Sequence, residues 1–153
     1  MEYGSVQREI QAEVESLLAG MGFELVELRL VRGRMQTRIQ VTVYRSLGVG
    51  INDCSSISRN LRPRLELIEG LGDFMLEISS PGVDRLIKAP QEYRVFQGRG
   101  VRLLLENEED WLGGVISGVT AEAVLLARGG RVEEIRLASI RKARLDHTQE
   151  VLK

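Results

Sequence analysis

The sequence predicts an α+β protein of two domains, in which an N-terminal α-β-β-α-β domain is followed by a small five-stranded β-barrel. Three observations support this fold class. Two segments in the first half carry apolar residues at helical spacing, other segments alternate as strands do, and short strands with regular turns follow from residue 101 onward. The length of 153 residues suits two small domains, which we expect over residues 1–88 and 89–153.

Two helices are expected in the N-terminal domain. Ser5 is a candidate N-cap of the first helix and Gly20 is its candidate C-terminal stop, while Asn52 and Asp53 suit the start of the second. Pro63 should kink or shorten the second helix, because proline removes one backbone donor. The apolar positions at helical spacing are Val6, Ile10, Val14, Leu17 and Leu18 in the first helix and Cys54, Ile57, Leu61, Leu65 and Ile68 in the second.

Three strands complete the N-terminal domain. We expect them over residues 23–32 and 38–44, joined by a connection of hairpin length, and around Phe74, Leu76 and Ile78. The order α-β-β-α-β then predicts a three-stranded sheet with two helices packed on one face. The other face should be open to solvent. It would carry Arg29, Arg38, Gln40, Thr42, Tyr44 and Glu77.

Five short strands are expected in the C-terminal domain. Gly129 and Gly130 form a hairpin dipeptide, and Gly113 and Gly114 would let a strand bend sharply. Five closely spaced strands are typical of an SH3-like or Sm-like barrel. The expected strands are residues 101–105, 111–118, 123–127, 132–136 and 140–145.

Charge is strongly segregated along the chain, although the formal net charge is only −1. Residues 29–64 hold eight arginines against Asp53 alone, a net charge of +7, and they follow residues 1–28, whose net charge is −5. The planar guanidinium of arginine suits bidentate contact with phosphate. The segment is therefore either a surface that docks on nucleic-acid phosphates or a solvated hairpin whose arginines pair with the acidic helix. The eight residues are Arg29, Arg32, Arg34, Arg38, Arg45, Arg59, Arg62 and Arg64.

Composition disfavours several classes of function. The single cysteine, Cys54, cannot form an intramolecular disulfide, which suits a reducing cytoplasm. One cysteine and one histidine, His147, cannot build a His/Cys metal site, and no credible nucleophile–base pair is visible. No apolar run is long enough to span a membrane. We therefore expect no enzymatic activity, no cofactor and no membrane association.

One string near the end of the N-terminal domain is distinctive. Residues 76–85 read LEISSPGVDR and resemble the signature of the bacterial ribosome maturation factor RimP family. Residues 22–26, 51–54, 93–99 and 140–145 are also similar to that family. The similar segments occur in the same order over almost the whole chain, which makes the resemblance far more specific than one turn motif.

The resemblance implies the same domain order, with an α/β domain before an SH3-like or Sm-like barrel. It also implies a non-enzymatic role in assembly of the 30S small ribosomal subunit, through association with the free or immature subunit. The implied partners are 16S rRNA and the small-subunit ribosomal protein numbered twelve, near the future decoding centre. We expect a cytoplasmic monomer. The alternative is a general RNA-binding module of the Sm or RRM type that acts on free RNA.

The turn between the two domains is a second candidate site. One interpretation is structural: the turn locks the exit of the third strand, because proline, glycine and short polar residues are what a rigid turn requires. The other is that Asp84 or Arg85 contacts components of the ribosome. The residues of this turn are Ser79, Ser80, Pro81, Gly82, Asp84 and Arg85.

The C-terminal domain offers a third candidate site, which we expect to bind a ribosomal protein. Its acidic turn suits a basic partner, unless the turn is only a solvated hairpin tip. In a regular strand the neighbouring Arg141 and Lys142 cannot both point inward or both outward. The candidate residues are Glu108, Glu109, Asp110, Trp111, Arg141, Lys142 and Arg144.

Overall fold

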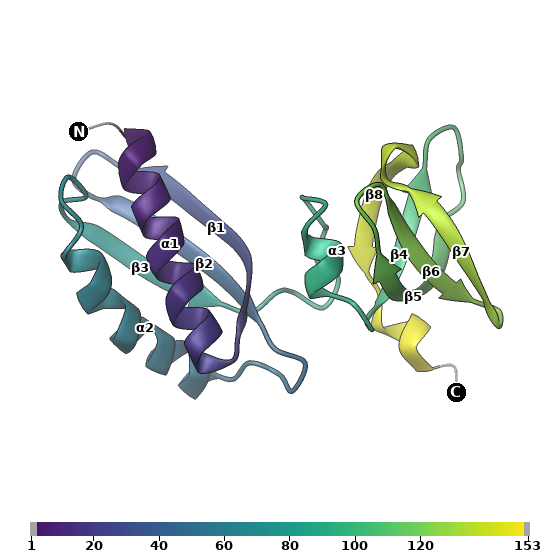
Figure 1. The fold of residues 1–153 in the computed structure, drawn as a ribbon, viewed down its shortest axis with the longest axis horizontal. Coiled ribbons are helices and arrows are strands. Elements are labelled where there is room, and N and C mark those ends of the chain that lie inside the picture. Colours follow the sequence, from purple (N-terminus) through teal and green to yellow (C-terminus); the bar gives the residue numbers. More distant parts are fainter. Residues whose placement is uncertain (1–2, 152–153) are drawn as a thin grey trace. The chain divides into compact units, whose positions relative to one another are not determined.

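The polypeptide passes from a first unit, which ends at Pro81, to a second unit, which begins at Gly82 (Figure 1). The computed structural model describes residues 3–151. We refer to the two parts as unit 1 and unit 2. The boundary expected after residue 88 stays a prediction. No helix in the described range is long and apolar enough to cross a membrane.

Unit 1 has the predicted order of helix, strand, strand, helix and strand. Its three strands form one sheet in the order β1-β2-β3, with β1 antiparallel to β2 and β2 parallel to β3. Both helices cover the same face of this sheet, as predicted (Figure 1). The elements are α1 (Tyr3–Met21), β1 (Glu24–Arg32), β2 (Thr37–Tyr44), α2 (Ile51–Glu66) and β3 (Phe74–Ser79).

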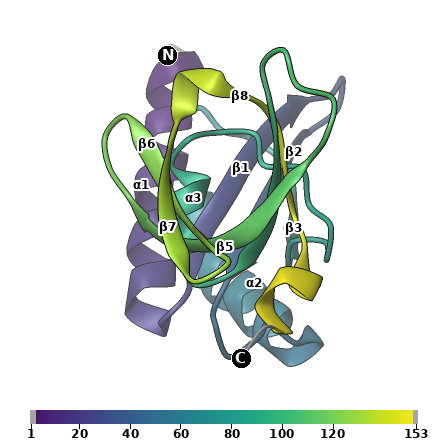
Figure 2. The same cartoon turned by 90° about the vertical axis from the view of Figure 1, so that its right-hand side faces the viewer.

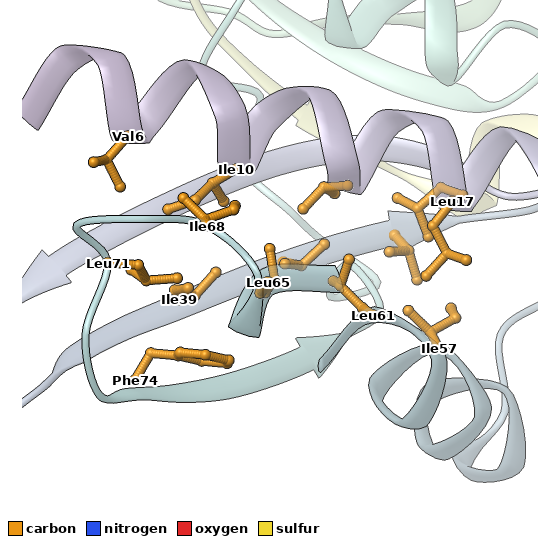
Figure 3. Close-up of a cluster of buried hydrophobic side chains, with 14 of the residues drawn as sticks. Val6, Ile10, Leu17, Ile39, Ile57, Leu61, Leu65, Ile68, Leu71 and Phe74 are labelled. Carbon is orange, nitrogen blue, oxygen red and sulfur yellow. The ribbon is translucent and has the colours of Figure 1, made fainter. Parts of the chain in front are cut away.

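The core of unit 1 lies between the helices and the sheet, where the apolar stripe of each helix meets the inner face of the strands (Figure 3). Ile10, Ile39 and Leu61 are at most 1% exposed. Burial of side chains of this size removes most of their apolar surface from water, which stabilises the fold by about 1.5 to 3 kcal/mol for each residue. The helical spacing in the sequence therefore reports this packing directly.

The helix ends differ from the predicted caps. Ser5 and Gly20 both lie inside α1, which ends at Met21, and Gly22 follows it with a φ of 85°. Gly50 is the N-cap of α2, and the Gly50 amide donates a hydrogen bond of 2.8 Å to the Asp53 carboxylate. Pro63 lies within α2, which ends at Glu66, before the predicted apolar position Ile68. The helix therefore continues past Pro63 and ends two residues before the last position of the apolar pattern.

The strand register separates the two faces of the unit 1 sheet. The pairs Leu30↔Ile39 and Ile39↔Leu76 belong to the core face. The neighbouring pairs Arg29↔Gln40 and Gln40↔Glu77 therefore belong to the open face, because successive residues of a strand point to opposite faces. The other open-face positions are Glu24, Glu27, Val31, Arg38, Thr42, Tyr44, Met75 and Ser79. The six residues expected on this face are all there.

Tyr44 corrects one expectation about that face. Its register opposite Glu24 places it on the open face, yet it is only 8% exposed. The regular alternation of β1 breaks at Val26, where a bulge adds one residue between the pairs of Leu25 and Glu27. Val26 is also buried, and neither it nor Tyr44 belongs to the core beneath the helices. The open face therefore presents no exposed tyrosine.

Unit 2 is a five-stranded antiparallel sheet preceded by a short helix (Figures 1 and 2). The strand order is β7-β6-β5-β4-β8. In the described part of unit 2, β7 and β8 do not pair with each other, so the sheet is not closed and the expected barrel is not confirmed. The elements are α3 (Glu92–Val95), β4 (Gly100–Leu105), β5 (Leu112–Val119), β6 (Ala123–Arg128), β7 (Arg131–Arg136), η1 (Leu137–Ser139), β8 (Ile140–Leu145) and η2 (His147–Val151).

Candidate functional site

The arginines of residues 29–64 fall into groups that the strand register defines. Arg29 and Arg38 lie on the open face, close to the β1–β2 hairpin that carries Arg34. Arg32 pairs with Thr37, which is paired in turn with the core-face residue Phe74, so Arg32 lies toward the helix side of the sheet. The hairpin therefore carries arginines toward both faces.

One of the two open-face arginines, Arg38, lies beside a carboxylate. Arg38 Nη2 is 3.3 Å from Glu77 Oε2, and the Gln40 side-chain amide donates a bond of 2.9 Å to Glu77 Oε1. These bonds, from Gln40 first and then from Arg38, lower the pKa of the Glu77 carboxyl below its ordinary value. The pair is exposed, so a phosphate could compete for Arg38 at little cost in stability.

Arg45 lies at the opposite end of β2 from the hairpin. Its Nη2 is 3.1 Å from Asp53 Oδ2, its Nε donates to the Gly48 carbonyl at 3.0 Å, and its guanidinium lies 4.4 Å from the centre of the Phe23 ring. These contacts join Arg45 to α2, to the loop between β2 and α2, and to the residue before β1. Arg45 therefore holds the loop between β2 and α2 in place.

The three arginines of α2 also differ in their surroundings. Arg64 Nη1 lies 3.7 Å from Glu13 Oε1 of α1, and the Arg62 guanidinium lies 4.8 Å from the centre of the Phe74 ring. Arg59 lines a shallow hollow of about 420 Å³ between α2 and β3 with Cys54, which is only half-buried rather than a core residue. Burial raises the pKa of the Cys54 thiol, as does the nearby Asp53 charge.

The eight arginines therefore do not share one surface. In the described part of the chain, Arg29, Arg34 and Arg59 make no ion pair, hydrogen bond or ring contact through their side chains, whereas Arg38, Arg45 and Arg64 are ion-paired. Arg64 shows the expected pairing of an arginine with the acidic helix, through Glu13. That these arginines bind RNA stays a prediction.

The turn that follows β3 ends in a buried ion pair. The Arg85 amide donates to the Gly82 carbonyl at 3.2 Å, so the turn centres on residues 83–84, and Gly82 does not adopt a positive φ. The Arg85 guanidinium binds Glu92 of α3, whose side chain is 1% exposed. Ser79 is the last residue of β3, and Ser79, Ser80 and Asp84 are all exposed.

The acidic turn of unit 2 is fully at the surface. Glu108, Glu109 and Asp110 are exposed, and Trp111, 39% exposed, follows them just before β5. The Arg102 guanidinium lies 5.4 Å from the centre of the Trp111 ring. An exposed indole beside carboxylates can contact an apolar and basic partner surface.

The basic residues of β8 divide into two environments. Arg144 Nη1 donates to the Asp84 carbonyl at 3.2 Å, which fastens the turn to the sheet. Arg141 and Lys142 are exposed and both line a small cavity together with Lys88 and Tyr93. The sequence does not single out Lys88 and Tyr93, because no pattern joins these two residues to β8, which lies far along the chain.

In the described residues, no group of three or more histidine, cysteine, aspartate or glutamate side chains is placed to hold a metal ion.

Two comparisons place the chain among known proteins. Residues 13–84, from within α1 to the turn after β3, match the family described as RimP N-terminal domain. The chain is also 27% identical over 137 residues to the ribosome maturation factor RimP of Borrelia turicatae (strain 91E135), which covers 90% of this chain and 94% of that protein. Both findings confirm the resemblance first indicated by residues 76–85: the chain is similar to the RimP family, in unit 1 by the family match and over most of its length by the relative.

Proposed function

We propose that this protein is a non-enzymatic ribosome maturation factor that acts in assembly of the 30S small subunit. The observation that carries the proposal is its similarity, over 90% of the chain, to a protein named as a ribosome maturation factor. It would act as a cytoplasmic monomer that binds the free or immature subunit. Unit 1 would contact 16S rRNA, and unit 2, as an SH3-like barrel, would contact the ribosomal protein numbered twelve.

The rRNA contact would use the hairpin end of the open face. Arg29, Arg34 and Arg38 are exposed there. Glu77 lies beside Arg38, whereas the other acidic open-face residues, Glu24 and Glu27, lie near the start of β1, away from the hairpin. Without an exposed aromatic side chain for base stacking, this surface would bind phosphates and groove shape rather than read bases. The remaining arginines of residues 29–64 would tie unit 1 together or add weaker contacts at its other faces.

The test compares two triple variants of equal charge. Arg29→Gln, Arg34→Gln and Arg38→Gln together should weaken association with free 30S subunits and flatten its dependence on salt concentration. The control combines Arg8→Gln, Arg59→Gln and Arg64→Gln, which lie on the two helices. Co-sedimentation with purified 30S subunits measures both. Unchanged binding by the first variant, or equal losses by the two, would refute a specific role for the open face.

The contact with a ribosomal protein would use the acidic turn and Trp111. Ribosomal proteins are mostly basic, so the exposed carboxylates of Glu108, Glu109 and Asp110 offer complementary charge. Trp111 would supply the apolar centre of such an interface, where aromatic side chains contribute most of the binding energy.

The alternative function is a general RNA-binding module of the Sm or RRM type. A formal net charge of −1 and the scarcity of exposed aromatic residues disfavour it, because such modules need broad positive potential or stacking platforms. Co-sedimentation separates the two. An assembly factor associates with free 30S subunits but not with 70S ribosomes or bulk RNA, whereas a general module binds all three.

A further inference from the structure

Unit 2 contains a basic cavity of about 190 Å³ that neither the family match nor the acidic turn explains. Its walls come from four places: the chain before α3, which supplies Lys88; α3 itself, which supplies Tyr93; η1, which supplies Leu137; and β8, which supplies Arg141 and Lys142. The backbone of this wall is fixed, because the Ile87 amide donates to the Ala143 carbonyl of β8 at 2.8 Å.

A β-bulge brings the two cations of β8 into this cavity. Leu104 of β4 pairs with Lys142, and the next residue, Leu105, pairs with Ile140, so Arg141 is an extra residue in the strand. A regular strand would send the side chains of Arg141 and Lys142 to opposite faces. Bulges re-aim side chains in this way and often occur beside functional sites. Here both residues line the same cavity.

The chemistry of the lining selects an anion. Three basic residues line the cavity, and no aspartate or glutamate is among its lining residues. The nearest acid in sequence is Glu92, which is 1% exposed and is bound by the Arg85 guanidinium and by the Lys88 amide at 3.3 Å. Glu92 is therefore turned to its own partners rather than available to neutralise Arg141 and Lys142.

Tyr93 adds a hydrogen-bond donor to the cations. It is 5% exposed, and burial, together with the neighbouring Glu92 charge, raises its pKa to about 12. Its phenol therefore keeps its proton at neutral pH and can donate a hydrogen bond to an anionic oxygen. Two or more cations with a neutral donor match the charge and the several acceptor oxygens of a phosphate group.

We propose that the cavity lined by Lys88, Tyr93, Arg141 and Lys142 binds a backbone phosphate of RNA. Pockets for drug-sized ligands span about 300 to 1,000 Å³, so this cavity suits a compact phosphate rather than a whole nucleotide. The inference rests on the proposed function only in taking RNA as the molecule that carries the phosphate. It gives unit 2 an RNA contact in addition to its proposed protein contact.

The experiment uses the full chain, labelled for NMR and titrated separately with inorganic phosphate and with a short single-stranded oligouridylate. Both ligands should shift the amide signals of Tyr93, Arg141 and Lys142. The double variant Arg141→Gln/Lys142→Gln should bind the oligonucleotide roughly tenfold more weakly at low salt, because charge-assisted hydrogen bonds are lost. The matched control is Arg131→Gln/Arg136→Gln, which removes the same charge elsewhere in unit 2.

Three outcomes would overturn the proposal. Equal losses in the two double variants would indicate general electrostatic attraction, and shifts that avoid Tyr93 would place the anion elsewhere. Saturation by inorganic phosphate that the oligonucleotide does not compete away would identify a free phosphate site instead. Because the probes are free phosphate and RNA, failure here would leave 30S association by unit 1, and hence the proposed function, intact.

Discussion

The guanidinium of Arg85 forms two parallel hydrogen bonds with the carboxylate of Glu92, from Nε to Oε1 at 2.9 Å and from Nη2 to Oε2 at 3.1 Å. Both side chains are almost fully buried, at 10% and 1% exposure. The pair ties the turn at the start of unit 2 to α3. Arg85 was a candidate for ribosome contact, and its burial favours the structural interpretation of the turn.

Replacement of Arg85 by alanine should therefore destabilise unit 2 by about 3 kcal/mol, because it leaves the buried Glu92 carboxylate without its partner. Urea unfolding followed by the fluorescence of Trp111, the only tryptophan of the chain, measures the loss. The double variant Arg85→Leu/Glu92→Leu should recover a large part of it, since it removes both buried charges. Normal stability of Arg85→Ala combined with lost 30S binding would instead assign Arg85 to a ribosome contact.

The second prediction concerns acid and the C-terminal 3₁₀ helix, η2. Glu150 Oε2 accepts bonds of 2.8 Å from Arg99 Nε and from the Gly100 amide, which hold η2 against β4. Burial alone would raise the pKa of Glu150, but these bonds and the charges of Arg99 and His147 outweigh it and lower the pKa below its ordinary value.

The sign of the pH effect follows from that direction. A lowered carboxyl pKa in the folded protein stabilises it fully above the ordinary value for glutamate, about 4.3, and the stabilisation is lost as pH falls through the lowered folded pKa. Glu150→Gln should cost about 1 to 2 kcal/mol at neutral pH and should remove this part of the acid sensitivity. Urea unfolding of both proteins between neutral and acid pH tests it. Parallel pH curves would show that Glu150 does not carry the effect.

The sequence predicted the architecture of unit 1 because its signals are local. Alternation in β2 and helical spacing in α1 and α2 each report one buried face, and they place Ile39, Val41 and Leu61 in the core where the structure has them. Helix ends were less predictable, since Ser5 and Gly20 have the chemistry of caps but lie within α1. At the C-terminal end of α1 the apolar face continues past Gly20 to Met21, which packs against the core, so packing overrides the local preference of Gly20.

The candidate sites were less predictable than the fold. The ion pairs Arg38–Glu77 and Arg64–Glu13 join residues 39 and 51 positions apart, and no periodicity connects such partners. The bulge at Arg141 depends on the register of β8 against β4, which the sequence of β8 alone does not contain. The expectation that Arg141 and Lys142 face opposite sides held only for a regular strand.

Two glycines should respond in opposite directions to alanine. A Cβ at Gly114 of β5 would lie 2.7 Å from both the Ala127 carbonyl oxygen and Leu126 Cγ, so Gly114→Ala should destabilise unit 2 by about 1 to 3 kcal/mol. A Cβ at Gly20 of α1 would meet nothing within 4 Å, so Gly20→Ala should stabilise unit 1 by about 0.4 to 1 kcal/mol. Thermal unfolding followed by circular dichroism and by Trp111 fluorescence separates the two units. Equal signs for the two variants would contradict the packing described.

Trp111 should report directly on a protein partner of the acidic turn. Because it is 39% exposed, its fluorescence should be quenched by acrylamide, and a saturating basic ribosomal protein should shield it. The triple variant Glu108→Gln/Glu109→Gln/Asp110→Asn should weaken binding roughly tenfold and reduce its dependence on salt concentration, because complementary charge chiefly sets the association rate. The matched control, Glu122→Gln/Glu133→Gln/Glu134→Gln, removes the same charge from other turns and strands of unit 2. Equal weakening by the two triple variants, or a Trp111 signal that stays constant to saturation, would leave the acidic turn as a solvated hairpin tip.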